Sequence, residues 1–241
     1  MIGAMILAAG RGERMRPLSD TTPKPLLAVG GAPLIVWQIR ALAKAGITDI
    51  AINVSHLADR MIGAVGDGSA FGVSIRWSCE TEPLETAGGI ATAMPLLPEG
   101  PALIVSGDIW TAYDYARLLP LAARMAQDAE AARVHLVMVG NPTYHREGDF
   151  TLVPQPRGLP QVSTAAGTTY TYGNIGVYDT ALFRALPRGV KCRLLPLLLA
   201  WIGQGRVTGE VFDGPWANVG TPADLAHLDA ALGRSLQGES R

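Results

Sequence analysis

Short apolar runs recur along the first 140 residues and alternate with segments of helical spacing. The runs predict strands at residues 4–9, 49–54, 73–78, 102–107 and 134–140. The apolar positions that share a helical face between these runs are Leu34, Ile35, Ile39 and Leu42, then Leu57, Met61, Ile62 and Val65, then Leu118, Leu119 and Ala122. Strands that alternate with helices predict an α/β fold whose mostly parallel sheet is covered on both faces.

The second half of the chain has a less regular pattern. Residues 141–170 are rich in Pro, Gly and Thr, which predicts loops with short strands, and residues 172–179 alternate like a strand. We expect a helix near 192–203, a strand near 206–212 and a closing helix with Thr221 as its N-cap. No segment has the composition of a linker, so we predict one domain over residues 1–241, with a polar tail at 233–241 that frays.

Composition and charge narrow the classes of partner. The formal net charge is −1, which argues against binding to nucleic acid, because such proteins neutralise many phosphates. Cys79 and Cys192 lack metal-ligand spacing, and we interpret them as reduced thiols of a cytoplasmic protein. The first ten residues lack the basic start of a signal peptide, and the apolar runs are too short to cross a bilayer, so we expect no membrane partner.

The stretch LAAGRGERMRPLSDTTPKPL (residues 7–26) follows the first predicted strand. Glycines allow close approach of a backbone to a ligand, and successive N–H groups form an anion-binding nest. The dinucleotide pattern is excluded because Met15 occupies its third glycine position, and the Gly-Lys-Ser/Thr of a Walker A loop is missing. We therefore predict a phosphate loop of another kind, in which Arg14 and Lys24 supply the cations; the alternative is a solvated basic surface loop.

The sequence LAAGRGERMRPLSDTTPKPLLAVGGAPLI resembles the N-terminal signature of the sugar-1-phosphate nucleotidyltransferases, or NDP-sugar pyrophosphorylases. The resemblance continues through EPLETAGGI (82–90), SGDIW (106–110) and WANVGTPADL (216–225). It implies a Rossmann-like three-layer sandwich of the GT-A-like type with a mostly parallel mixed sheet. It also implies a nucleotide-binding half at 1–110 and a sugar-phosphate-binding half at 111–232.

The resemblance further implies a reaction and its substrates. A sugar 1-phosphate and a nucleoside triphosphate give an NDP-sugar and pyrophosphate; the attacking phosphate is already ionised, so the enzyme needs cations and Mg²⁺ rather than a general base. The segments EPLETAGGI, GDIW and NPTYHREGDF favour UTP and N-acetylmuramate 1-phosphate, in peptidoglycan recycling. The alternatives are guanylyl transfer to mannose 1-phosphate and a catalytically weak, nucleotide-binding regulatory homologue.

Residue roles follow from the same resemblance. The residues implied for the nucleotide are Ala9, Gly10, Arg11, Gly12, Arg14, Lys24, Glu82, Ala87 and Gly88. Arg14 is expected to hold the β- and γ-phosphates and Lys24 the α-phosphoryl group. Glu82, Ala87 and Gly88 are expected to lie against the base, although two glycines there could also simply begin a helix.

Asp108 follows an apolar strand, where open α/β sheets place their ligand sites, and we predict that it binds Mg²⁺; the alternative is a turn aspartate. The second carboxylate usual in the family is replaced by Asn218, which keeps an oxygen ligand without the charge, and nearby Asp213 could substitute. The Glu-Lys-Pro segment of many relatives is also missing at 151–162. We expect the sugar phosphate near Asp149, Tyr172 and Asn174, which could equally be polar residues of turns and strand surfaces.

Overall fold

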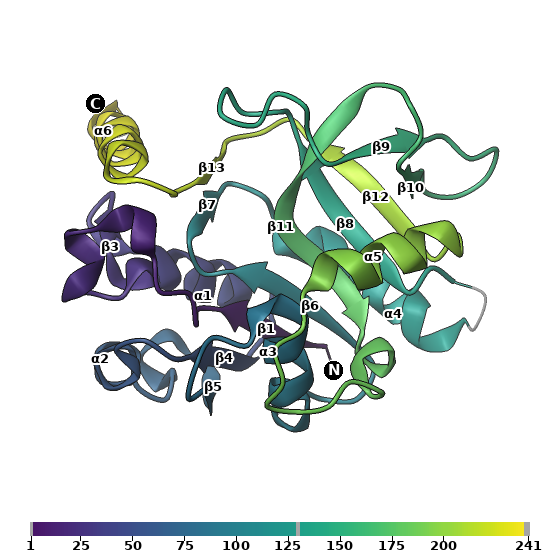
Figure 1. The fold of residues 1–241 in the computed structure, drawn as a ribbon. Coiled ribbons are helices and arrows are strands. Elements are labelled where there is room, and N and C mark those ends of the chain that lie inside the picture. Colours follow the sequence, from purple (N-terminus) through teal and green to yellow (C-terminus); the bar gives the residue numbers. More distant parts are fainter. Residues whose placement is uncertain (1, 129–130, 239–241) are drawn as a thin grey trace.

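The computed structural model describes residues 2–128 and 131–238, and a nine-stranded sheet forms its centre (Figure 1). The strand order is β5-β4-β1-β6-β11-β8-β12-β10-β9. The strands of this sheet are β1 (Gly3–Leu7), β4 (Asp49–Val54), β5 (Ser74–Cys79), β6 (Pro101–Ser106), β8 (Val134–Val139), β9 (Phe150–Val153), β10 (Gln161–Ser163), β11 (Thr169–Asp179) and β12 (Val207–Phe212).

The sheet is mixed, and its parallel part positions the candidate site. Strands β5, β4, β1 and β6 are parallel neighbours, and β8 is parallel to β12. Strand β11 runs antiparallel between β6 and β8, which joins the two parallel parts. Leu7 at the end of β1 pairs with Ser106 at the end of β6. The loops that follow these two strands therefore emerge side by side at one edge of the sheet.

Helices cover both faces of the sheet and bury alternate strand residues. One apolar cluster joins Ala4 and Ile6 of β1 to the helices α1 (Leu34–Lys44), α2 (Ala58–Val65) and α4 (Leu119–Gln127). A second cluster joins Met5 of the same strand to α3 (Glu85–Ala93) and α5 (Leu194–Gly203). Because successive side chains of a strand point to opposite faces, these two clusters define a three-layer α/β/α sandwich.

The C-terminal segment returns to the N-terminal half of the molecule. Strand β13 (Trp216–Asn218) pairs with β7 (Ile109–Thr111), and helix α6 (Pro222–Gly238) packs near the hairpin of β2 (Ala28–Val29) and β3 (Ala32–Pro33) (Figure 1). The apolar side chains that hold this region together are Met15, Leu27, Val29, Leu34, Val219, Leu228 and Leu232. The 3-10 helices of the described chain are Glu13–Met15, Leu18–Asp20, Lys24–Leu26, Ser69–Phe71, Met94–Leu96, Tyr115–Leu118 and Thr180–Phe183.

The predicted α/β fold is confirmed, and most predicted strands and helices lie within a few residues of their expected bounds. The closing helix begins as expected: Thr221 Oγ1 accepts the Asp224 N–H at 3.2 Å, and Asp224 Oδ2 accepts the Thr221 N–H at 2.8 Å. Helix α6 continues to Gly238, so much of the segment expected to fray is helical, and the last expected tail residues, 239–241, lie outside the described residues. Within the described chain, no helix is both long and apolar enough to cross a membrane.

Candidate active site

The loop after β1 is folded around Gly12. This glycine has φ +65°, and its carbonyl oxygen accepts hydrogen bonds from the Met15 N–H at 2.8 Å and from Ser19 Oγ at 2.8 Å. A Cβ atom at Gly12 would lie 3.1 Å from the Cβ of Lys24. Both the backbone conformation and the close approach of Lys24 therefore require glycine here. At Gly10, by contrast, a Cβ would meet no atom within 4 Å, so the backbone there borders open space.

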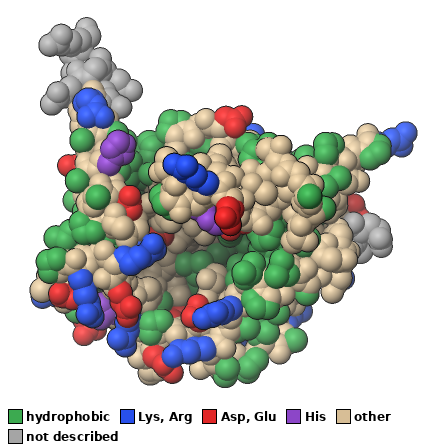
Figure 2. All heavy atoms as spheres, turned by 45° about the horizontal axis from the view of Figure 1, so that its top comes forward, with side chains coloured by type: hydrophobic (Ala, Val, Ile, Leu, Met, Phe, Trp, Pro, Cys, Tyr) green, Lys and Arg blue, Asp and Glu red, His purple; other side chains and the backbone are tan. Residues whose placement is uncertain are grey.

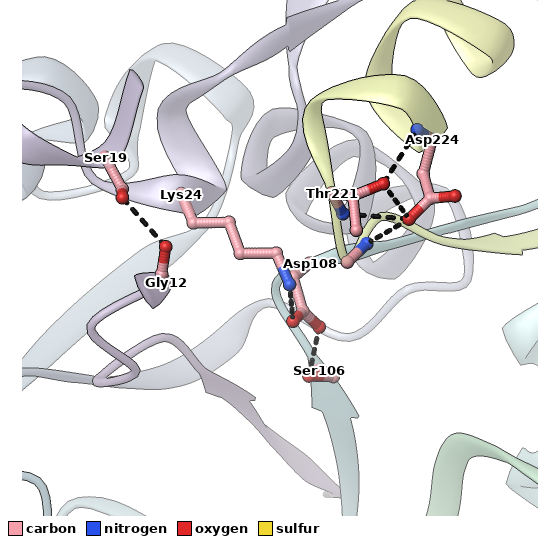
Figure 3. A network of polar contacts seen from close by, with 8 residues as sticks. Gly12, Ser19, Lys24, Ser106, Asp108, Thr221 and Asp224 are labelled. Atoms are coloured by element: carbon pink, nitrogen blue, oxygen red, sulfur yellow. Dashed lines mark hydrogen bonds and ion pairs between the residues drawn. The ribbon is translucent and has the colours of Figure 1, made fainter. Parts of the chain in front are cut away.

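Lys24 and Asp108 meet across the site. Lys24 Nζ lies 2.5 Å from Asp108 Oδ2, and Ser106 Oγ donates to Asp108 Oδ1 at 2.6 Å (Figure 3). Lys24 is only 8% exposed, between two prolines that restrict its backbone. A buried ammonium group needs a partner of opposite charge, and Asp108 supplies it. The amine is thus fixed at the wall between the loop and the end of β6.

Asn218 lies beside Asp108 because β13 pairs with β7. Its register partner is Ile109, and the following residue, Val219, donates its N–H to the Asp108 carbonyl oxygen at 3.1 Å. The Oδ1 atom of Asn218 is buried and has no hydrogen-bond partner among the described residues. An oxygen left without a donor is a candidate cation ligand. Asp213, the alternative second ligand, precedes β13 and lines neither of the cavities described below.

Two adjoining cavities meet at Asp108. The smaller, of about 600 Å³, is lined by cationic and glycine residues of the loop, namely Gly10, Arg11, Gly12, Arg14 and Lys24. The larger, of about 830 Å³, opens between the end of the parallel sheet and the β11–α5 region. Both are lined by Leu7, Gly10, Pro83 and Asp108. Figure 2 shows a hollow with an apolar floor and charged side chains around its rim. Such neighbouring spaces can hold two ligands that react with each other.

Arg14 of the loop lies against the start of the C-terminal segment. A Cβ at Gly220 would lie 3.4 Å from Arg14 Nη1 and 3.4 Å from Asp224 Oδ2. Tyr144 is close to the same groups: burial raises the pKa of its hydroxyl and the Asp224 charge adds to this, whereas hydrogen bonding to Asn218 and the Arg14 charge oppose it. The structure therefore brings Arg14, Lys24, Asp108 and Asn218 to one end of the sheet, as the sequence predicts.

The residues expected to lie against the base are placed differently. Glu82 forms an ion pair with Lys191 at 2.5 Å, and Ala87 and Gly88 are buried in α3. None of the three is among the residues that line either cavity. A Cβ at Gly88 would lie 2.3 Å from the Val190 carbonyl oxygen, so this glycine allows the segment 190–192 to dock on α3. The assignment of these residues to the nucleotide remains a prediction that the cavity does not support.

The polar residues that line the larger cavity near the start of α3 are instead Asn53, Glu80 and Glu85. Asn53 Oδ1 accepts the Ala8 N–H at 2.9 Å, and Asn53 Nδ2 donates to Glu80 Oε1 at 2.7 Å. Glu80 Oε2 accepts the Leu84 N–H at 2.9 Å, which links the loop after β1 to the start of α3. Sequence analysis missed this chain of contacts. Both Asn53 and Glu80 lie at the carboxyl ends of parallel strands, the same signal that identified Asp108.

The three candidates for the sugar phosphate all line the larger cavity. Asp149 accepts the Tyr172 N–H at 2.8 Å and pairs with His145 at 3.0 Å. The Tyr172 hydroxyl hydrogen-bonds to that of Tyr178 at 2.9 Å, and burial raises the pKa of Tyr172. Asn174 has φ +57°, where β11 is irregular in its pairing with β8. The expectation that the sugar phosphate lies near these three residues stays a prediction, and their place along the larger cavity supports it.

The chain resembles known proteins of one enzyme family. Residues 3–145 match the model of the nucleotidyl transferase family. The chain is 44% identical over 231 residues to an N-acetylmuramate α-1-phosphate uridylyltransferase of Neisseria meningitidis, covering 95% of this chain and 98% of the relative. It is 30% identical to a mannose-1-phosphate guanylyltransferase of Mycobacterium tuberculosis, over 98% of this chain and 66% of that one.

Among solved structures, a putative glucose-1-phosphate thymidylyltransferase of Bacillus anthracis has a TM-score of 0.81 and 20% identity, covering 97% of this chain and 96% of its own. That likeness concerns the fold, which is the expected nucleotidyltransferase sandwich. The family match and the 44% identical relative show that the chain is of the nucleotide-transferring class of enzymes. The chain belongs to the nucleotidyl transferase family.

Proposed function

We propose that this enzyme is a uridylyltransferase that converts UTP and N-acetylmuramate 1-phosphate to UDP-N-acetylmuramate and pyrophosphate. The observation that carries the class of reaction is the meeting of Lys24 and Asp108 at the wall shared by a cation-lined cavity and a larger second cavity. The preference for UTP and this sugar rests on the relative that is 44% identical and matches over nearly its whole length.

The smaller cavity suits the triphosphate. Arg11 and Arg14 border it, and the open backbone at Gly10 allows a phosphate to approach closely. Lys24 lines this cavity and pairs with Asp108, which lines both cavities, so its charge would act near the phosphorus at which the two substrates react. A cation already fixed by a partly buried ion pair needs little reorganisation when negative charge develops in the transition state.

The attacking group needs no base from the protein. A phosphate monoester is ionised at neutral pH, and the task of the site is to hold two polyanions together against their repulsion. Arg14 and Lys24 supply the positive charge for this on the nucleotide side. Asp149 and Asn174 are proposed to bind polar groups of the sugar itself, because a carboxylate would repel its phosphate. This division explains why the described residues that line the two cavities include a single histidine, His145, and no cysteine.

We also propose that Asp108 and Asn218 hold Mg²⁺ together with substrate phosphate oxygens. Mg²⁺ binds few protein ligands and prefers oxygen, which fits one carboxylate and one unpartnered amide oxygen. When bound, Mg²⁺ would supply positive charge against the triphosphate. Within residues 2–128 and 131–238, no group of three His, Cys, Asp or Glu side chains is arranged to bind a metal by itself, which fits a site completed by the substrate.

The direct test measures pyrophosphate release by the full chain with UTP, N-acetylmuramate 1-phosphate and Mg²⁺. We expect turnover with this pair and much slower turnover with GTP and mannose 1-phosphate, the pair suggested by the 30% identical relative. Faster reaction with GTP and mannose 1-phosphate would reverse the assignment. No release with any nucleotide and sugar phosphate would instead support the regulatory homologue, which would still bind a nucleotide.

A further inference from the structure

We propose that Arg193 binds the carboxylate of the acidic sugar substrate and so selects it over neutral amino sugars. This inference rests on the proposed function, because it concerns how that substrate is recognised. An N-acetylmuramate unit is an N-acetylglucosamine unit with a lactyl ether, which adds one methyl group and one carboxylate. A site specific for it must therefore provide a cation away from the phosphate and an apolar surface beside that cation.

The larger cavity offers one such cation. Among the described residues that line it, Arg193 is the only arginine or lysine. His145, the other basic side chain there, already pairs with Asp149. Arg193 forms no ion pair with a described residue, whereas its neighbour Lys191 is neutralised by Glu82. An unpaired guanidinium at the wall of a cavity can bind a carboxylate in a bidentate manner, through two parallel N–H···O hydrogen bonds.

The backbone around Arg193 is fixed by α3. The Gly88 N–H donates to the Cys192 carbonyl oxygen at 3.1 Å, and the Cys192 N–H donates to the Leu84 carbonyl oxygen at 3.0 Å. Gly88 permits this contact, since any Cβ there would collide with the backbone of the docked segment. Arg193 then forms the N-cap of α5. The residue is thus held at a defined place rather than on a free loop.

Leucines adjoin the cation. Leu194, Leu195 and Leu198, from the first turns of α5, line the same cavity. Leu195 is 55% exposed, so its side chain offers apolar surface that a ligand in the cavity could cover. A lactyl methyl group could pack on these leucines while its carboxylate reaches Arg193. Helix α5 would also present backbone N–H groups at its start, which favour a negative charge.

The test compares N-acetylmuramate 1-phosphate with N-acetylglucosamine 1-phosphate, which lacks only the lactyl group. Pyrophosphate release by the full chain gives kcat/KM for each sugar with UTP. We expect Arg193→Ala to lower the ratio of the two values, acidic over neutral, by about tenfold or more, mainly through KM for the acidic sugar. Arg193→Lys should retain part of the preference. Lys191→Ala, which removes a paired cation two residues away, should leave the ratio unchanged.

Two outcomes would overturn the proposal. Equal losses of kcat/KM with both sugars would mean that Arg193 contacts the 1-phosphate, and unchanged kcat/KM values for both sugars would mean that it contacts neither the phosphate nor the carboxylate. If the wild-type chain turns over neither sugar, the proposed function fails. In that case, calorimetry with each sugar phosphate, on wild type and Arg193→Ala, still tests whether Arg193 binds the carboxylate. Thermal melting checks that each variant is folded.

Discussion

Lys24 is the side chain of the loop after β1 to which we assign stabilisation of the transition state. Its stem packs against Gly12 and its amine reaches Asp108. We expect Lys24→Met, which keeps the apolar stem, to lower kcat by about a hundredfold to a thousandfold, because charge stabilisation is lost where negative charge develops. The UTP dissociation constant, measured by calorimetry, should change far less.

Arg16→Met is the matched control for this variant. Arg16 lies in the same loop but lines neither cavity, and it pairs with Asp20 on the surface at 3.1 Å. We expect it to change kcat little, because an exposed ion pair contributes little free energy. If Lys24→Met weakened UTP binding as strongly as it slowed turnover, Lys24 would be a ground-state contact and its proposed role in the transition state would be wrong.

Asn218 tests the metal site with a readout other than turnover. Replacing it with Asp puts a second carboxylate beside Asp108, where the wild-type amide oxygen is buried without a donor. Without a divalent cation the two charges repel, so we expect Asn218→Asp to melt at a lower temperature than wild type in EDTA. With Mg²⁺ the variant should gain more thermal stability than wild type and need less Mg²⁺ for full turnover.

Asp213→Asn is the control for the metal prediction. Asp213 lies just before β13, whereas Asn218 is the last residue of that strand, and Asp213 borders neither cavity. Its replacement should leave the Mg²⁺ titration of melting temperature and activity unchanged. A shifted titration with Asp213→Asn and an unshifted one with Asn218→Asp would exchange the roles of the two residues. A large loss of turnover in Asn218→Asp at saturating Mg²⁺ would indicate that Asn218 contacts substrate instead.

At the scale of elements, Gly88 shows how helix α3 positions a neighbouring segment of the site. Its missing side chain lets the segment 190–192 dock on α3, since a Cβ would lie 2.3 Å from the Val190 carbonyl oxygen and 3.0 Å from the Cys192 nitrogen. Backbone atoms cannot move aside as a flexible side chain can. We therefore expect Gly88→Ala to lower the free energy of unfolding by about 1–3 kcal/mol and to raise KM for the acidic sugar by displacing Arg193.

Gly63→Ala in α2 is the matched control. Gly63 lies inside a helix, is exposed, and has no atom within 4 Å of a Cβ placed on it. Alanine there should stabilise the chain by about 0.5–1 kcal/mol, because it removes backbone freedom from the unfolded state without a clash. Urea unfolding measures both changes. Stabilisation by Gly88→Ala would show that the docked segment yields easily and that the contact does not fix Arg193.

The elements also show what the sequence could predict. The strands at 49–54 and 134–140 were predictable because long apolar runs are the strongest local signal. Strands β2, β3, β7 and β13 have two or three residues each, too few for any periodicity, and were missed. The antiparallel position of β11 between β6 and β8 could not be predicted from local sequence either, because strand pairing depends on partners far along the chain.

The residues of the candidate site also differ in whether the sequence could predict them. Lys24 and Asp108 are 84 positions apart, yet each carried its own signal: prolines and glycines around the first, the end of an apolar strand at the second. Between β5 and α3, Glu80 carried the same signal as Asp108, because it directly follows a parallel strand, but this signal was not used. Glu82 was assigned on the resemblance of EPLETAGGI to the family motif, whereas Glu80 and Glu85, the latter with φ +63°, line the larger cavity.

At the scale of the whole molecule, the C-terminal helix supports the N-terminal loop. Leu228 of α6 is buried with Met15, Leu27 and Val29, and the Gly30 N–H donates to Asp229 Oδ1 at 2.8 Å. The loop that supplies Arg14 and Lys24 thus packs against the last element of the chain. The loop after β1 and helix α6 form one unit at the nucleotide side of the site, although most of the sheet separates them in sequence.

This packing predicts that removing a buried side chain of α6, away from both candidate cavities, weakens UTP binding. Leu228→Ala should cost about 2–5 kcal/mol of unfolding free energy, as for other buried leucines, and should raise the UTP dissociation constant several-fold by loosening the loop. Leu118→Ala makes the same deletion in the separate core beside α4 and should cost similar stability without changing UTP affinity. Urea unfolding and calorimetry on both variants separate the two effects. Equal weakening by both would mean that general destabilisation, rather than contact with α6, controls the loop.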